Sequence, residues 1–597
     1  MTALHTITDW RRAYADGASP RTLLADLRKR LVAGDPAWIH RCDAAFVETQ
    51  IDALPAQPSE ATPLWGVPFA VKDNIDVAGL PTTAACPAFA YRPARTAGSV
   101  ARLMAAGAVL VGKTNLDQFA TGLVGTRSPC GEVPNSFDAA YVSGGSSSGS
   151  ASVVARGLVP FALGTDTAGS GRVPAGFNNL VGLKPSPGRV PMQGVLPACR
   201  TLDVVSVFAL TVADAALAYA LIEGADDEAR FATPVLQRGW LGGCGRPLRF
   251  GVPTQPGCDA SLGWDRAFES ACTRAKALGA EIVPVDFAPL FEIASLLYDG
   301  PWVAERFVVV EALMREQPGA MDATVRAVIE RADGYDATAA FRARYRLEDL
   351  RAQVAPLWRE VDALLVPTAP TCPTRAAVAQ EPVQRNSELG RYTNFVNLLG
   401  LAALALPSQV PADGLPFGVT LIAPGGADAA LVDFGQRWEA EAALPLGARL
   451  REARAEDREF VRRPASAAAL RVAVVGAHLE AMPLHGQLIE RHCRLVARTR
   501  TAPAYRLHAL TGTVPPKPGL ARLRDGDEGR FIELEVYEMP ADAVGSFLAA
   551  IPPPLGLGSV QLEDGSWVKG FICEPHAIAD APDISSHGGW RAYMASR

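Results

Sequence analysis

Residues 144–150 read Gly-Gly-Ser-Ser-Ser-Gly-Ser, and residues 164–172 read Gly-Thr-Asp-Thr-Ala-Gly-Ser-Gly-Arg. Glycine is too frequent in both stretches for the interior of a helix or a strand, so we predict two loops whose backbone approaches another group closely. The second stretch follows the apolar run 161–164, which is typical of a buried strand. Successive N–H groups in such a loop can point into one cavity and stabilise a negative charge there.

Short apolar runs alternate with alanine-rich helical patterns from residue 63 to residue 437. This alternation predicts an α/β fold in which a central mixed sheet is flanked by helices. The predicted strands are 66–71, 109–112, 161–164, 249–252, 363–367 and 417–423. The predicted helices are 99–106, 214–222, 265–278, 291–314 and 428–441, and residues 1–55 are predicted to be mainly helical.

With 597 residues the chain is too long for one hydrophobic core. A charged stretch, 449–463, ends at Pro464 and passes into alanine- and serine-rich residues, a composition that is typical of a linker. We therefore predict a first domain over residues 1–450, a linker over 451–468 and a second domain over 469–597. The second domain contains six of the eight histidines: His478, His485, His492, His508, His576 and His587.

The composition favours small-molecule chemistry. A net charge of −6 provides no basic surface for nucleic acid or for an anionic membrane. The N-terminus does not resemble a secretory leader and no run of about 18 apolar residues occurs, so we expect a cytoplasmic protein without membrane partners. The ten cysteines include no C-x-x-C pair and the histidines lack H-E-x-x-H spacing, so we expect neither a metal nor a cofactor.

A serine in these loops could act as a nucleophile only with a base to take its proton. The first 470 residues contain only two histidines, His5 and His40, and both precede the glycine-rich loops. Lys72 instead follows the apolar run 66–71, and lysine is seldom buried without a function. On composition alone a phosphate-binding loop or a plain turn is the alternative, but neither loop has the lysine that follows the last glycine of a phosphate-binding loop.

The segment 66–74, Gly-Val-Pro-Phe-Ala-Val-Lys-Asp-Asn, and the two glycine-rich loops resemble the three hallmark blocks of the amidase signature family. The resemblance extends over about residues 20–445. It implies the amidase signature fold, with Ser170 as the nucleophile, Ser146 as a bridging serine and Lys72 as the general base. It also implies a cis peptide bond before Ser146.

This resemblance also implies a mechanism. Neutral Lys72 accepts the proton of Ser146, Ser146 accepts that of Ser170, and Ser170 attacks an amide carbon to form an acyl-enzyme. Burial is expected to lower the pKa of the lysine from about 10.4 to roughly 7 or 8. The oxyanion is expected to bind the backbone N–H groups of Thr167, Ala168, Gly169 and Ser170. Ala168 stands where many family members have glycine.

The second domain has its own resemblance. The segments 474–479, Val-Val-Gly-Ala-His-Leu, and 531–537, Phe-Ile-Glu-Leu-Glu-Val-Tyr, are similar to the C-terminal domain of the allophanate hydrolase family. That domain is a small α+β unit that resembles the cyclotransferase-like fold. The family implies hydrolysis of allophanate to ammonia and N-carboxycarbamate, with the C-terminal domain assisting decarboxylation. His478 becomes a candidate proton donor, and a histidine with a purely structural role is the alternative.

The substrate-binding residues come from the same resemblance. Tyr298 and Arg306 are eight residues apart, so they are predicted to lie on roughly one helix face, with Pro301 as a potential kink. On spacing alone a core tyrosine and a surface arginine are the alternative. The family implies that both hold the substrate carboxylate and that the backbone at Gly122 lines the same pocket.

We expect a homodimer that acts on a small-molecule substrate in functional association with a urea carboxylase, with no nucleic-acid partner. Two other functions stay open. One is another amidase, such as the glutaminase-type subunit of an amidotransferase, although that subunit would not carry this C-terminal domain. The other is a non-catalytic scaffold, which the presence of the lysine and both serines disfavours.

Overall fold

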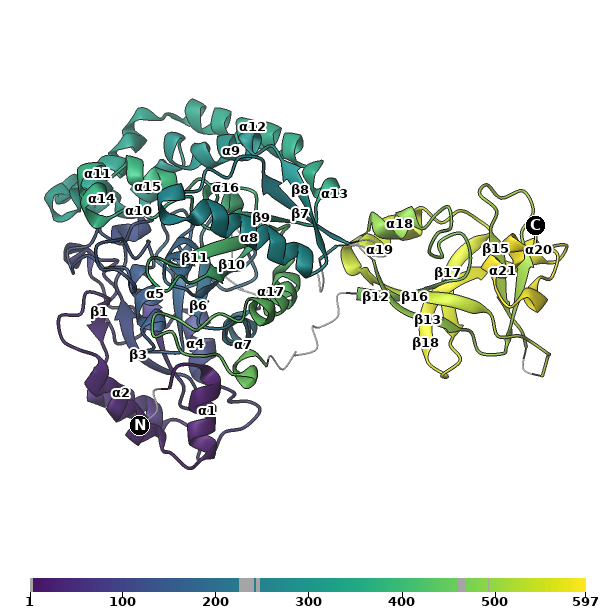
Figure 1. The fold of residues 1–597 in the computed structure, drawn as a ribbon, viewed down its shortest axis with the longest axis horizontal. Helices are drawn as coiled ribbons and strands as arrows, with labels where there is room; N and C mark the ends of the chain where they lie inside the picture. The colour runs from purple at the N-terminus through teal and green to yellow at the C-terminus, as the bar shows by residue number, and fades with distance from the viewer. Residues whose placement is uncertain (1–3, 225–240, 243–246, 460–468, 492, 525) are drawn as a thin grey trace. The chain divides into compact units, whose positions relative to one another are not determined.

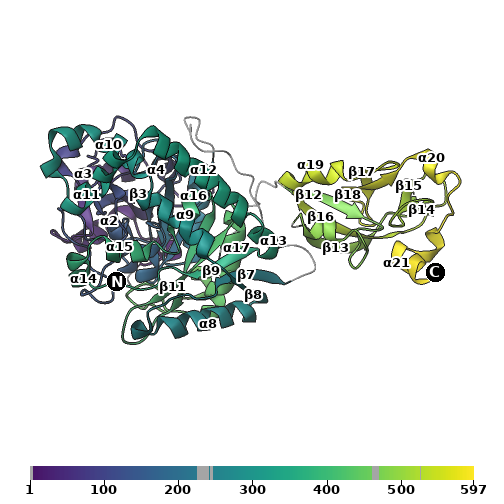
Figure 2. The same ribbon diagram turned by 90° about the horizontal axis from the view of Figure 1, so that it is seen from above.

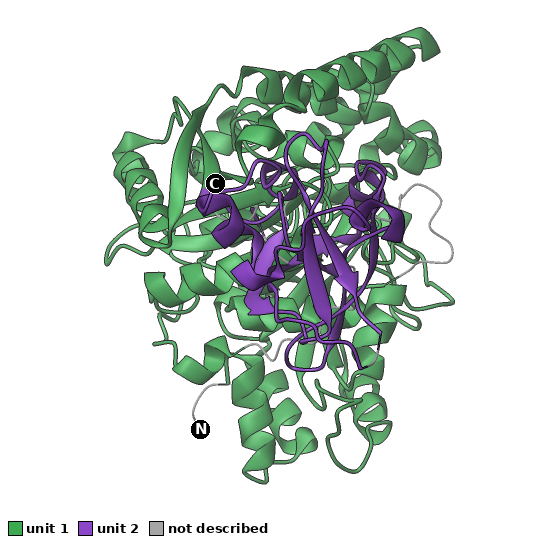
Figure 3. Ribbon diagram, turned by 90° about the vertical axis from the view of Figure 1, so that its right-hand side faces the viewer, with its two compact units in different colours: residues 1–235, 249–461 green, residues 236–248, 462–597 purple. Residues whose placement is uncertain are grey.

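The chain forms two compact units, which are described separately (Figures 1 and 3). Unit 1 contains residues 1–235 and 249–461, and unit 2 contains residues 236–248 and 462–597. The computed structural model describes residues 4–224, 241–242, 247–459, 469–491, 493–524 and 526–597. His492 and residues 460–468 of the predicted linker lie outside these ranges.

Unit 1 is built on an eleven-stranded mixed sheet with the strand order β1-β3-β2-β4-β6-β5-β10-β11-β9-β7-β8. Strand β2 runs parallel to β3 and β4, and β7 runs parallel to β9. The strands are β1 Trp38–Arg41, β2 Pro68–Lys72, β3 Val109–Thr114, β4 Phe161–Asp166, β5 Val181–Lys184, β6 Val204–Ala209, β7 Leu248–Pro253, β8 Ala280–Val285, β9 Ala363–Pro367, β10 Ala402–Gln409 and β11 Phe417–Ala423. The predicted α/β fold with a central mixed sheet is confirmed.

Helices flank this sheet, and Figure 2 shows α8 and α12 on opposite sides of its strands. The helices of unit 1 are α1 Ile7–Ala15, α2 Pro20–Arg30, α3 Ala44–Asp52, α4 Gly98–Ala105, α5 Ser148–Ala155, α6 Val173–Phe177, α7 Val212–Ile222, α8 Trp264–Ala277, α9 Ala288–Asp299, α10 Val303–Glu316, α11 Ala323–Glu330, α12 Ala337–Val354, α13 Leu357–Glu360, α14 Arg375–Gln380, α15 Gln384–Leu389, α16 Asn394–Leu398 and α17 Asp428–Ala442. The strands β2, β3, β4, β9 and β11 are buried along their whole length, as expected for a sheet covered on both faces.

Two predicted elements differ from the structure. The single helix predicted over 291–314 is wrong, because α9 ends at Asp299 and α10 begins at Val303. Pro301 lies in the break, where its ring and missing N–H do not allow a helix interior to continue. In the mainly helical first 55 residues, β1 also forms and pairs antiparallel with β3. That short strand depends on its partner more than on local propensity, so the local pattern did not predict it.

The charged segment after α17 contacts the beginning of the chain. Arg451 Nη2 donates to Asp9 Oδ1 at 3.0 Å, and Arg451 Nη1 donates to Asp457 Oδ2 at 2.9 Å. Thr6 Oγ1 donates to Asp457 Oδ1 at 2.9 Å. Residues 451–457 of the predicted linker therefore pack against the N-terminal cap of helix α1.

Unit 2 is an α+β domain. Its five-stranded sheet has the order β13-β16-β12-β18-β17, in which β12 and β18 are parallel and the other pairs are antiparallel. A separate hairpin joins β14 to β15. The strands are β12 Ala469–Val474, β13 Arg494–Arg500, β14 Tyr505–Ala509, β15 Pro518–Arg522, β16 Glu533–Pro540, β17 Leu555–Gln561 and β18 Trp567–Cys573. The helices are α18 Gly486–Ile489, α19 Ala541–Ala549, α20 Pro575–Ile578 and α21 Trp590–Ala595.

Within the described ranges, none of the helices combines the length and the apolar character needed to span a membrane. The same ranges contain no group of three or more histidine, cysteine or acidic side chains that could hold a metal ion.

Candidate active site

The candidate active site lies at the carboxyl ends of three adjacent parallel strands. Lys72 is the last residue of β2, and it pairs with Thr114 at the end of β3. Strand β4, on the other side of β2, ends at Asp166. Because the carboxyl ends of parallel strands meet at one edge of the sheet, the segments that follow β2, β3 and β4 converge there.

Lys72, Ser146 and Ser170 form a continuous chain of hydrogen bonds. Lys72 Nζ donates to Ser146 Oγ at 2.7 Å, and Ser146 Oγ donates to Ser170 Oγ at 2.9 Å. Lys72 Nζ also donates to Thr165 Oγ1 at 2.8 Å. The three side chains predicted to share a proton relay are therefore in hydrogen-bond contact, and each residue is at most 2% exposed.

Burial sets the ionisation of the lysine. Removal of Lys72 from water disfavours its charged form and lowers its pKa to about 7. The carboxyl groups of Asp117, Asp203 and Asp166 oppose this shift, and the positive charge of Arg306 adds to it. A substantial neutral population of Lys72 therefore exists near neutral pH, as a general base requires.

The first glycine-rich loop places Ser146 between β3 and α5. Gly144 has φ +77°, and the Gly145–Ser146 peptide bond is cis. A Cβ on residue 145 would overlap Oδ2 of Asp117, so only glycine fits there. Helix α5 begins at Ser148, directly after the loop.

The second loop is held at both ends by one buried ion pair. Arg172 Nε donates to Asp166 Oδ2 and Arg172 Nη2 donates to Asp166 Oδ1, each at 2.9 Å. Asp166 Oδ2 also accepts from Gly171 N at 2.9 Å. Burial by itself would raise the pKa of Asp166, but the adjacent Arg172 lowers it below its usual value. Ser170 lies inside the segment that this pair closes.

The predicted oxyanion donors lie in the same loop. The backbone N–H groups of Thr167, Ala168, Gly169 and Ser170 donate to no acceptor within the part of the chain that the structure describes. Ala168 is buried in an apolar cluster that includes Cys199 and Leu202. Its φ is not positive, so its methyl group causes no backbone strain. These four N–H groups remain available to a ligand.

Tyr298 and Arg306 face each other across the break between α9 and α10. Arg306 Nη2 donates to Tyr298 Oη at 3.4 Å, and the guanidinium lies 5.4 Å from the centre of the tyrosine ring. Arg306 Nη1 donates to Ala120 O at 3.2 Å and to Thr121 Oγ1 at 2.9 Å. The predicted pairing on one helix face is replaced by a contact between two helices.

Arg306 is buried without a counter-ion. It is 2% exposed, its Nε has no hydrogen-bond partner, and no carboxylate of the described residues forms an ion pair with it. A buried charge is normally paired because desolvation is costly. An unpaired buried guanidinium therefore favours the binding of an anion.

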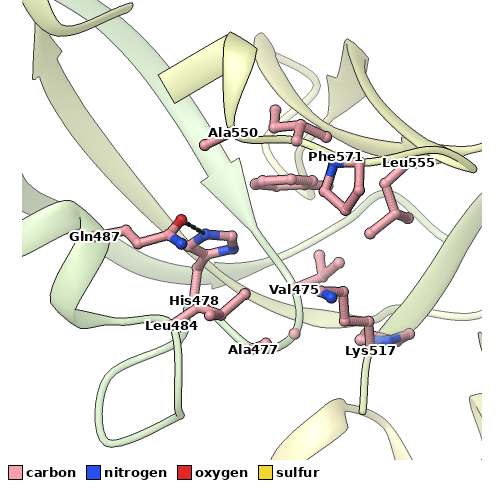
Figure 4. Close-up of a pocket in the computed structure, with 13 residues that line it drawn as sticks. Val475, Ala477, His478, Leu484, Gln487, Lys517, Ala550, Leu555 and Phe571 are labelled. Atoms are coloured by element: carbon pink, nitrogen blue, oxygen red, sulfur yellow. Dashed lines mark hydrogen bonds between the residues drawn. The ribbon is translucent and has the colours of Figure 1, made fainter. Parts of the chain in front are cut away.

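His478 lies in unit 2, in the segment that follows β12. It contributes to a pocket with about 440 Å³ of empty space, which Gln487, Lys517 and Phe571 also line (Figure 4). The Gln487 Oε1 atom lies 3.0 Å from His478 Nε2, and because an amide oxygen only accepts, Nε2 carries the proton. Burial lowers the pKa of His478, so the imidazole is neutral at pH 7.

The comparisons with known proteins agree with this architecture. The family model described as Amidase matches residues 38–432, which is more than half of the chain. The chain belongs to the amidase family. The model described as Allophanate hydrolase C-terminal domain matches residues 470–595 of the same amidase. The resemblances to the amidase signature family and to the allophanate hydrolases are therefore confirmed.

Individual relatives cover one or both units of this amidase. The urea amidolyase of Saccharomyces cerevisiae is 44% identical over 614 residues, which is 99% of this chain and 33% of that protein. The Kluyveromyces lactis allophanate hydrolase structure is 43% identical with a TM-score of 0.80 and covers 99% of each chain. A glutamyl-tRNA(Gln) amidotransferase subunit of Thermus thermophilus is 36% identical over 400 residues, which is 62% of this chain and 83% of that relative. The chain spans about a third of the length of the urea amidolyases that it matches.

Sequence reasoning missed several residues of the amidase site. Thr165 and Arg172 lie inside the quoted glycine-rich loop, so their proximity to Ser170 could have been predicted. Asp117 and Asp203 lie outside every quoted motif. The only signal for Asp117 is its place three residues after a buried strand, whose end could have been aligned with that of β2.

Proposed function

We propose that this protein is an allophanate hydrolase that cleaves allophanate to ammonia and N-carboxycarbamate through a Ser-Ser-Lys relay. The observation that carries the proposal is the buried guanidinium of Arg306, which has no carboxylate partner among the described residues and lies beside Tyr298. Allophanate is a small urea derivative with one carboxylate. That carboxylate supplies the missing negative charge, and its amide end is the group that an amidase attacks.

The chemistry proceeds along the hydrogen-bond chain. Neutral Lys72 accepts the proton of Ser146, Ser146 accepts that of Ser170, and the Ser170 oxygen attacks the terminal amide carbon. The N–H groups of residues 167–170 stabilise the oxyanion. The relay returns the proton to the leaving nitrogen, ammonia departs, and an ester joins Ser170 to the remaining –CO–NH–COO⁻ group. Water, deprotonated through the same relay, then cleaves the ester and releases N-carboxycarbamate.

Three residues orient the substrate in this proposal. Arg306 binds the carboxylate through its guanidinium, Tyr298 donates its hydroxyl proton to the same group, and the backbone at Gly122 lines the pocket. A Cβ on residue 122 would lie 2.6 Å from Asp117 Oδ2, so the backbone can pass here only as glycine.

The substrate assignment is tested by measuring ammonia release from allophanate, a malonamate-type analogue, biuret and glutamine. We expect high kcat/KM for allophanate and for the malonamate-type analogue, because both carry the carboxylate. Biuret lacks it and is expected to be about 100-fold poorer. In an Arg306→Gln variant the difference between carboxylate-bearing and neutral amides should largely disappear. A preference of the wild-type protein for glutamine would instead identify a glutaminase.

We propose in addition that unit 2 decarboxylates the product. N-carboxycarbamate loses carbon dioxide when its C–N bond breaks, and the electron pair that stays on nitrogen takes a proton. His478 donates that proton after binding of the dianion has raised its pKa, and Lys517 in the same pocket attracts the dianion. The match of residues 470–595 to the allophanate hydrolase C-terminal domain supports this role.

We also propose a homodimer that works together with a urea carboxylase. In the urea amidolyases the matched region is one third of a longer chain, so further parts of those proteins accompany it. A biotin- or ATP-dependent carboxylation of urea is the class of reaction that would supply allophanate. Light scattering on the purified protein measures the oligomeric state, and a monomer would contradict this part of the proposal.

A further inference from the structure

Asp117 has a buried carboxylate that no step of the proposed mechanism uses. It lies on the segment after β3, and its side chain is excluded from solvent. Its carboxylate accepts from Val124 N at 3.2 Å, from Gly125 N at 3.0 Å and from Arg127 N at 3.0 Å. All of these partners are N–H donors, an arrangement that favours the ionised carboxylate.

The three N–H groups belong to one loop, 122–127. This loop begins at Gly122, which follows the carbonyl of Ala120 and the hydroxyl of Thr121 that Arg306 holds. Arg127 contributes a second contact to that segment, because its Nη1 donates to Thr121 O at 2.9 Å. Asp117 therefore anchors the loop that is continuous with the proposed carboxylate site.

The same residue also contacts the catalytic loop. Asp117 N donates to Ser146 O at 3.1 Å. Its Oδ2 occupies the position that a side chain on Gly145 would need, so the carboxylate packs directly against the backbone of that residue. A single buried aspartate thus connects the loop beside the carboxylate site to the loop that carries the bridging serine.

Its charge acts on the base of the relay. Among the charged groups that face Lys72, Asp117 is the carboxylate with the largest effect, and it raises the pKa of the lysine. Asp203 and Asp166 act in the same direction, and Arg306 acts in the opposite direction. Burial raises the pKa of Asp117 itself, and the charge of Arg127 and the backbone N–H groups lower it.

We propose that Asp117 is a positioning residue that fixes the distance between the substrate carboxylate site and the Ser146–Ser170 pair. The proposal rests on the proposed function, because it takes the surroundings of Gly122 and Arg306 as the carboxylate site. A substrate held at one end by Arg306 reacts at its other end with Ser170. Its amide carbon meets the nucleophile only when loop 122–127 and the catalytic loop keep a constant separation.

The test is Asp117→Asn. The amide has nearly the same size, but it removes the charge and turns an NH₂ group toward the backbone N–H groups of loop 122–127. We expect kcat/KM for allophanate to fall about 100-fold, with a rise in KM, because the reacting groups are misaligned. The acid limb of the kcat/KM profile should move to lower pH, since Lys72 loses the carboxylate that favours its protonated form.

A second variant separates charge from position. Asp117→Glu keeps the negative charge but cannot keep the three hydrogen bonds at once, because its carboxylate is displaced by one methylene. We expect the loss in kcat/KM to persist while the acid limb stays near its wild-type position. The matched control is Asp428→Asn, which removes another buried carboxylate of unit 1. Asp428 accepts from Ser186 N and Ser186 Oγ at 2.7 and 2.6 Å and contacts neither loop, so both quantities should stay unchanged.

Titration with a serine-reactive fluorophosphonate counts the functional Ser170 sites, so rates per site are compared even when part of a variant does not fold. Wild-type KM and a wild-type acid limb in Asp117→Asn overturn the proposal. A fall in kcat alone, with both other quantities unchanged, also overturns it. The wild-type assay comes first and keeps the proposals distinct: inactivity toward allophanate refutes the proposed function, and the Asp117 comparison is then made with the amide that the wild type does hydrolyse.

Discussion

At the scale of single residues, Lys72 shows how one position combines a base with its means of activation. The residue ends a strand that is buried along its length, so desolvation lowers its pKa to about 7 without any cationic neighbour in direct contact. Its hydrogen bond to Ser146 aims the same nitrogen at the relay. The lysine therefore does what a histidine does in other serine hydrolases.

The first residue-scale prediction concerns pH. The neutral form of Lys72 is the active form, so kcat/KM should rise about tenfold per pH unit below a midpoint near pH 7 and level off above it. Lys72→Ala should lower kcat/KM by about 10⁴-fold or more, because the relay loses its base. Steady-state ammonia release between pH 5 and pH 9 measures both effects.

The matched control for this prediction is Lys184→Met. Lys184 is a second buried lysine whose pKa burial lowers to about 7, but its Nζ donates to the backbone carbonyls of Pro185 and Leu401. The midpoint should stay in place in this variant. A midpoint that moves with Lys184 and not with Lys72 would assign the titration to the wrong lysine in our mechanism.

At the scale of elements, the strand-to-helix connection around Ser170 is stabilised by a closed ion pair. Arg172 grips Asp166 with two nitrogens, and Arg172 Nη2 also reaches Asn397 Oδ1 at 3.1 Å. The loop therefore joins the end of β4 to the beginning of α6 and to helix α16. A glycine-rich segment acquires a single conformation through these contacts and not through local propensity.

This arrangement predicts the effect of Arg172→Met. Asp166 would remain buried with no counter-ion, which destabilises a protein by about 3–5 kcal/mol. Urea denaturation followed by circular dichroism measures the loss in the free energy of unfolding. The double variant Asp166→Asn with Arg172→Met should recover part of that loss, because no buried charge is then unpaired. Equal stability of the two variants would argue against the ion pair as the cause.

At the scale of the whole molecule, the two units divide the proposed chemistry. Unit 1 contains the amide-cleaving relay, and unit 2 contains a separate pocket with a neutral histidine and a lysine. Two-step chemistry of this kind predicts that the steps can be separated by mutation. The intermediate that connects them is N-carboxycarbamate.

We accordingly predict the behaviour of His478→Asn. Ammonia release in the first step should keep its wild-type rate, while carbon dioxide release catalysed by the protein slows about 100-fold, because the proton donor is lost. ¹³C NMR with labelled allophanate detects the accumulating N-carboxycarbamate. The control is His485→Asn, since His485 is buried in unit 2, contacts Tyr537 Oη at 3.4 Å and does not line the pocket. Unchanged decarboxylation in His478→Asn would refute the role of this histidine.

Most of the fold was predictable because strands buried on both faces give continuous apolar runs in the sequence. The predicted strands 363–367 and 417–423 coincide with β9 and β11. Strand β1 was not predicted, since four residues acquire their conformation only by pairing with β3. The helix predicted over 291–314 ends early because local periodicity continues across Pro301 although the backbone does not.

The two glycine-rich loops, Lys72 and the change in composition near residue 464 are visible in the amino-acid sequence alone, and they were sufficient to predict the family and its relay. Tertiary packing determines which charges accompany that relay. Asp117, Asp203 and the unpaired Arg306 come from distant segments, and burial, which no local pattern encodes, sets both the pKa of Lys72 and the need of Arg306 for an anion. Electrostatic interactions depend on distance and solvent exclusion, and both arise only when the separate strands and helices pack together.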